Sequence, residues 1–96
     1  MTNFRTIQDR ARELRALAHR HRATGISVFG SVARGSATES SDVDVLVECG
    51  DEMSLFDLAA LQSDLSELLD ARVDVVSSRA LKGAARERIL REAIRL

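Results

Sequence analysis

The stretch FGSVARGSATESSDVDVLVE, Phe29 to Glu48, decides the fold because it joins two strands through a loop rich in glycine and serine. Asp42 and Asp44 interrupt the second of these strands, which is otherwise apolar. Side chains alternate between the two faces of a strand, so the two carboxylates point the same way, about 7 Å apart. Val43 and Val45 then point into the core. Paired charges on one strand face cost stability unless a cation lies between them.

Hydrophobic periodicity on both sides of this stretch predicts further strands and helices. Strands are expected at Ile26–Phe29, Asp42–Cys49 and Arg72–Val76, and helices at Asn3–Arg22, from Ser54 to about Asp70, and from Ser77-Ser78 to Leu96. Thr24-Gly25 is expected to end the first helix, and the Gly30 loop to contain one helical turn. This order predicts a single domain over residues 1–96 of the α/β (α+β) class. Helices flank a small sheet of about three strands, which is mixed if the Gly30 loop joins an antiparallel pair.

Composition narrows the class of protein. The single cysteine, Cys49, excludes an internal disulfide and fits a reducing cytoplasm. No apolar run approaches the roughly 20 residues that a membrane span needs. With three Phe and no Trp or Tyr, a base-stacking surface for nucleic acid is not expected. The net charge is +4 over residues 5–22, +4 over residues 79–95 and −9 over residues 24–78. The basic segments are either solvated helix faces or a surface for an acidic partner or for nucleotide phosphates.

A third carboxylate strengthens the interpretation of Asp42 and Asp44 as a metal site. Asp74 is the only charged residue within the apolar run VDVV of the third expected strand. If that strand lies beside the second, Asp74 joins the other two carboxylates on one face. Mg²⁺ suits such a cluster, because it is bound by one or two carboxylates together with substrate phosphates. An ordinary exposed sheet face is the alternative, although aspartate is a poor strand former.

The loop supplies groups that can bind an anion. Gly30 directly follows the first strand, where the missing Cβ lets the backbone approach a phosphate. Ser31 adds a hydroxyl and backbone N–H groups at the start of the expected helical turn. A flexible hairpin is the alternative for a Gly-Ser pair alone, and Glu39 is treated as a solvated loop residue. The loop is not a P-loop, because no Gly-Lys-Ser/Thr follows at the required spacing.

These residues together resemble a known superfamily. Gly30-Ser31, ten intervening residues, Asp42-x-Asp44 and a later strand aspartate at Asp74 are similar to the nucleotidyltransferases related to DNA polymerase β. The longer segment GSVARGSATESSDVDVLVE resembles the corresponding segment of the minimal nucleotidyltransferases, which are stand-alone catalytic domains. The resemblance implies that Asp42, Asp44 and Asp74 hold two Mg²⁺ ions, and that Gly30 and Ser31 bind the triphosphate of ATP. Arg34 is either a further phosphate ligand or a surface residue.

The resemblance also implies a partner. Minimal nucleotidyltransferases are typically antitoxins that transfer AMP from ATP to a tyrosine of a helical HEPN-domain toxin, usually an RNase. The expectation is therefore a cytoplasmic protein adenylyltransferase that forms a hetero-oligomer with its toxin. Two alternatives stay open. The chain could silence a toxin by contact alone, or it could modify a small molecule once a partner chain completes the site.

Overall fold

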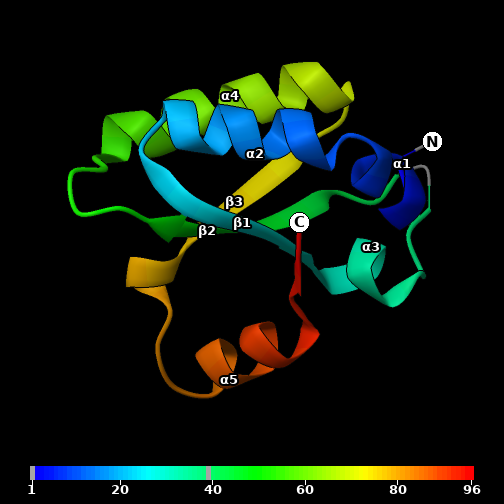
Figure 1. Ribbon diagram of the computed structural model, residues 1–96. Coiled ribbons are helices and arrows are strands. Elements are labelled where there is room, and N and C mark those ends of the chain that lie inside the picture. Colours follow the sequence, from blue (N-terminus) through cyan, green and yellow to red (C-terminus); the bar gives the residue numbers. More distant parts are fainter. Residues whose placement is uncertain (1, 39) are drawn as a thin grey trace.

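The computed structural model describes residues 2–38 and 40–96; Glu39, expected above to be solvated, lies outside them. Over this part of the chain, a sheet of four strands has helices on both faces (Figure 1). The strands are β1 (Ala23–Phe29), β2 (Val43–Cys49), β3 (Val73–Ser77) and β4 (Ile94–Arg95). The helices are α1 (Phe4–Asp9), α2 (Ala11–Arg20), α3 (Gly30–Arg34), α4 (Leu55–Leu69) and α5 (Gly83–Glu92), with a 3₁₀ turn at Ser78–Ala80.

The strand order β3-β2-β1-β4 gives a mixed sheet. The strands β1 and β2 are antiparallel, as the short Gly30 loop allows, and β2 and β3 are parallel because α4 makes the crossover between them. The predicted fold class and the mixed sheet are confirmed. The strand count was too low, because the last helix ends at Glu92 and Ile94–Arg95 pair with β1. A two-residue strand shows no periodicity that a sequence reading could detect.

Each face of the sheet has its own apolar layer. On one face, Val28, Val43, Val45 and Val73 are buried beneath α2 and α4, together with Leu61 of α4. On the other face, which α5 covers, a smaller cluster joins Phe29, Leu46 and Ile89. Asp44 and Asp74 alternate with the buried valines within their strands and therefore belong to the α5 side, whereas Asp42 lies directly before β2. The site is consequently built on the thinly covered face of the sheet.

The first helix differs from the prediction. It is divided at Arg10 into α1 and α2, and it ends at Arg20 rather than at Thr24-Gly25. Arg22 takes the left-handed backbone position that was assigned to glycine, with φ at 71°. Gly25 instead lies in β1, where a Cβ would collide with the Glu48 carboxylate. Gly25 therefore lies where side chains of neighbouring strands approach the backbone closely, and it does not end the helix.

The fourth helix begins as expected. The Ser54 hydroxyl accepts a hydrogen bond from the Asp57 N–H at 3.2 Å, and the Asp57 carboxylate accepts one from the Ser54 N–H at 2.8 Å. This reciprocal pair satisfies two N–H groups that would otherwise lack partners at the helix start. In the described part of the chain, every helix is too short or too polar to cross a membrane.

Candidate active site

Asp44 lies at the centre of the site. Its register partners are Phe29 on the antiparallel neighbour β1 and Asp74 on the parallel neighbour β3. Residues in register on adjacent strands share a face of the sheet, and the strands lie roughly 4.8 Å apart. The predicted juxtaposition of Asp44 and Asp74 is therefore present. Asp42 directly precedes β2.

Gly30 closes the site against Asp44. Its φ is +71°, and a Cβ added to it would overlap the Oδ2 atom of Asp44. Both features require glycine, because a side chain would be strained by the backbone and blocked by the carboxylate. Helix α3 starts at this residue and ends at Arg34, and Gly35, whose φ is +77°, follows it. Gly30 itself is buried, and the missing Cβ lets its backbone lie directly against the Asp44 carboxylate.

Two cavities lie beside the carboxylates. A cavity of about 370 Å³ is lined by Gly30, Ser31, Arg34 and Asp44. The structure therefore brings together the predicted phosphate-binding residues and one predicted metal ligand. Asp42 borders a separate cavity of about 650 Å³, which Arg10 and Arg72 also line. Asp74 is exposed and lies outside the linings of both cavities.

The electrostatics of Asp44 reflect this crowding. Partial burial raises the pKa of the Asp44 carboxyl above its ordinary value, and the Asp74 and Asp42 carboxylates raise that pKa further. Glu92 acts in the same direction, whereas the Arg34 guanidinium opposes it. The site thus holds more negative charge than its own side chains neutralise, which is the condition that a bound cation relieves.

The carboxylate oxygens of the three aspartates are chemically suited to bind Mg²⁺. All three aspartates offer carboxylate oxygens, which are the ligands that a hard cation such as Mg²⁺ prefers. The crowded charge at Asp44, and the Gly30 backbone that lines a cavity with it, are consistent with a cation shared with a phosphate. Among the described residues, however, no group of three or more His, Cys, Asp or Glu side chains is close enough to form a ready-made metal site. Metal binding by Asp42, Asp44 and Asp74 together therefore stays a prediction.

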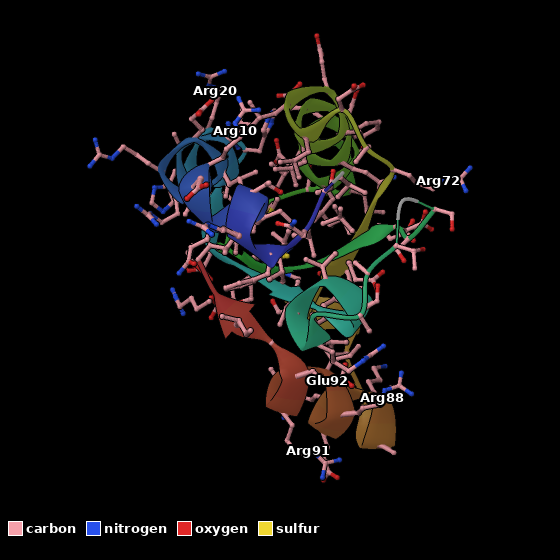
Figure 2. The ribbon with its side chains drawn as sticks, turned by 90° about the vertical axis from the view of Figure 1, so that its right-hand side faces the viewer. Arg10, Arg20, Arg72, Arg88, Arg91 and Glu92 are labelled. Carbon is pink, nitrogen blue, oxygen red and sulfur yellow. The ribbon has the colours of Figure 1, made fainter. Side chains whose placement is uncertain are left out.

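Two residues of the smaller cavity escaped the sequence reading. Arg88 and Glu92, one helical turn apart on α5, line it together with Gly30 and Ser31 (Figure 2). Arg34 donates a hydrogen bond from Nη1 to Oε1 of Glu92 at 3.1 Å. The sequence offered one indication of their position, which was the apolar residue Ile89. Residues that flank a buried position on a helix lie at the edge of the surface that the helix packs against. Nothing in the sequence showed that this edge faces Gly30.

Comparison of the sequence with models of known protein families identifies the family of this chain. The model of the nucleotidyltransferase domain matches residues 11–96, which include Gly30, Ser31 and all three aspartates. This chain belongs to the nucleotidyltransferase domain family. The resemblance drawn from the sequence is confirmed, and so is the predicted enzyme class. The roles of the individual motif residues stay a prediction.

Individual relatives agree with this assignment. A Methanocaldococcus jannaschii protein named as a candidate protein adenylyltransferase is 38% identical, over 92% of this chain and 95% of its own length. The protein adenylyltransferase MntA of Thermococcus cleftensis is 44% identical, over 72% of this chain and 70% of its own length.

Solved structures show the same fold. The structure of a candidate minimal nucleotidyltransferase superposes with a TM-score of 0.89 at 45% identity, covering 99% of this chain and 97% of that one. A tri-AMPylated HEPN toxin in complex with an MNT antitoxin from Shewanella oneidensis gives a TM-score of 0.69 at 20% identity, covering 92% and 69%. At that lower identity the match shows a shared fold.

Proposed function

We propose that this nucleotidyltransferase is an antitoxin that transfers AMP from ATP, with Mg²⁺, to a tyrosine hydroxyl of a cognate HEPN-domain toxin in the cytoplasm. The observation that carries the proposal is the register of Asp44 with Asp74, with Gly30 packed against the Asp44 carboxylate. Relatives named as protein adenylyltransferases support a protein acceptor. A fold neighbour that is an MNT antitoxin in complex with an AMPylated HEPN toxin supports the partner.

The residues have separable roles in this reaction. Gly30 and Ser31, which line the smaller cavity, bind the triphosphate through the loop backbone and the Ser31 hydroxyl, and Arg34 offsets part of its charge. Asp42, Asp44 and Asp74 would hold Mg²⁺, which supplies charge neutralisation at the phosphates and activation of the acceptor hydroxyl. The acceptor oxygen forms a bond to the α-phosphorus while the bond to the β-phosphate breaks. Pyrophosphate leaves and the acceptor proton passes to solvent, so positioning and electrostatics provide most of the catalysis.

Replacing Ser31 with alanine is expected to weaken nucleotide binding without unfolding the protein. A hydrogen bond to a charged group contributes about 1.5–3 kcal/mol, so the affinity for a non-hydrolysable ATP analogue should fall roughly tenfold or more. Calorimetric titration measures this change, and circular dichroism verifies the fold. Ser36→Ala, at an exposed residue of the same loop, is the matched control. Equal affinities for the two variants would contradict the role of Ser31.

A toxin-protection experiment distinguishes enzymatic neutralisation from silencing by contact alone. Asp42→Asn keeps the size of the side chain but removes a charge that the proposed metal site needs. Cells that express the toxin should lose protection when the wild-type chain is replaced by this variant at equal abundance. Co-purification of the variant with the toxin would show that contact itself is retained. Full protection by a variant that transfers no AMP would move the chain to the class of toxin-binding modules.

A further inference from the structure

The helix α5 forms one wall of the smaller cavity. Its single buried residue, Ile89, packs with Phe29 and Leu46 on the thinly covered face of the sheet. Because Gly30 directly follows Phe29, this contact fixes α5 opposite the phosphate-binding loop. Figure 2 shows Arg88 and Glu92 on the side of α5 that lies beneath α3. The wall therefore carries charged side chains toward the cavity.

The two arginines of the cavity differ in their partners. Arg34 is ion-paired with Glu92 at 3.1 Å, and the Glu92 side chain is only 27% exposed. The guanidinium of Arg34 is thus shared between Glu92 and any phosphate that enters. Arg88 forms no ion pair with any residue that the structure describes, although it lines the same cavity. Of the two arginines that line the cavity, Arg88 is therefore the one whose guanidinium is not held by a carboxylate among the described residues.

A polyphosphate in the cavity would need the positive charge of Arg88 in addition to that of Arg34. Asp44 and Glu92 offset Arg34 and Arg88 in the lining, so the protein alone provides no net positive charge for an anion. A polyphosphate adds several negative charges in the same space. An arginine fork can engage two phosphate oxygens at once, which gives both attraction and orientation. Arg88 has the position and the chemistry for this contact.

We propose that Arg88 binds the β- and γ-phosphates of the nucleotide, beside an Arg34 that Glu92 holds in position. This assignment rests on the proposed function, because it requires a nucleoside triphosphate in this cavity. The last helix then does more than cover the sheet, since it contributes a direct ligand to the polyphosphate. The ligand class is the polyphosphate tail, so a nucleoside monophosphate does not depend on Arg88.

Calorimetric titration of the full chain with AMP-PNP and Mg²⁺ tests the assignment. Arg88→Gln should weaken AMP-PNP binding about tenfold or more, because a charge-assisted hydrogen bond is lost. Arg88→Lys keeps the charge without the fork and should recover part of the affinity. Arg91→Gln is the matched control, since Arg91 is an exposed arginine of the same helix that points away from α3 (Figure 2). Its affinity should equal that of the wild type.

A parallel titration with AMP separates a phosphate contact from a change in the shape of the site. Arg88→Gln should leave AMP binding unchanged. Equal loss of AMP and AMP-PNP affinity, or equal AMP-PNP affinities for Arg88→Gln and Arg91→Gln, would overturn the assignment while the proposed function stands. If the wild-type chain binds no AMP-PNP, the proposed function fails and the role of Arg88 fails with it.

Discussion

Asp44→Asn is expected to lower AMP transfer at least about 100-fold while the protein stays folded. The substitution keeps the shape of the side chain but removes the negative charge at the centre of the site, between Phe29 and Asp74 in the sheet register. An amide is a weaker ligand than a carboxylate for Mg²⁺. A transfer assay with labelled ATP measures the loss. Transfer at the wild-type rate by the folded variant would remove Asp44 from the catalytic machinery.

The same substitution should raise the melting temperature of the metal-free protein at neutral pH. Because the pKa of Asp44 is raised in the folded state, ionisation of this carboxyl lowers stability as the pH rises from its ordinary value of 3.8 through the raised value. Above that interval the wild type has lost all of the stability that this ionisation removes, and the loss no longer changes with pH. Asparagine does not ionise, so the variant keeps this stability, and its advantage in melting temperature over the wild type should shrink as the pH falls through the same interval. Melting curves in a chelator at several pH values check the sign, and a variant less stable at neutral pH would contradict it.

Gly30→Val is expected to abolish detectable binding of a non-hydrolysable ATP analogue. A valine at φ +71° is strained, at a cost on the order of 1–3 kcal/mol, and its Cβ would overlap the Asp44 carboxylate. The loop must then move away from the position in which its backbone meets a phosphate. Calorimetry with Mg²⁺ present measures the affinity.

Gly35→Val separates the strain from the blocked site. Gly35 has φ +77°, but a Cβ added there meets nothing within 4 Å. Both variants should lose stability through the same left-handed backbone position, whereas only Gly30→Val should lose the nucleotide. Comparable nucleotide affinity for the two folded variants would contradict the role of Gly30 in phosphate binding.

The motif residues could be predicted because each depends on local sequence. The alternation of Asp44 with the valines of β2 fixes its face, and the helix between β2 and β3 allows the parallel pair that brings Asp74 into register. The capping residues Ser54 and Asp57 likewise form a local signal. Strand alternation, crossover length and helix capping all act over a few residues, so a single sequence contains them.

The parts that escaped prediction depend on contacts between distant segments. Arg34 meets Glu92 across 58 positions of the chain, and only the packing of Ile89 on Phe29 determines that contact. The strand β4 exists because two residues reach the edge of β1, which no periodicity reveals. The position of Gly25 depends similarly on Glu48, a residue of the neighbouring strand. Tertiary context therefore decided these features, including the α5 wall of the site.

The most direct test of the central claim is the intact mass of a cognate HEPN-domain toxin after incubation with this nucleotidyltransferase, ATP and Mg²⁺. The account predicts that the toxin gains mass in whole units of AMP, that peptide mapping places them on tyrosine, and that pyrophosphate is released. With Asp44→Asn in place of the wild type, the mass of the toxin should stay unchanged. An unmodified toxin that the wild-type chain nevertheless neutralises would contradict the account, because contact would then suffice without transfer.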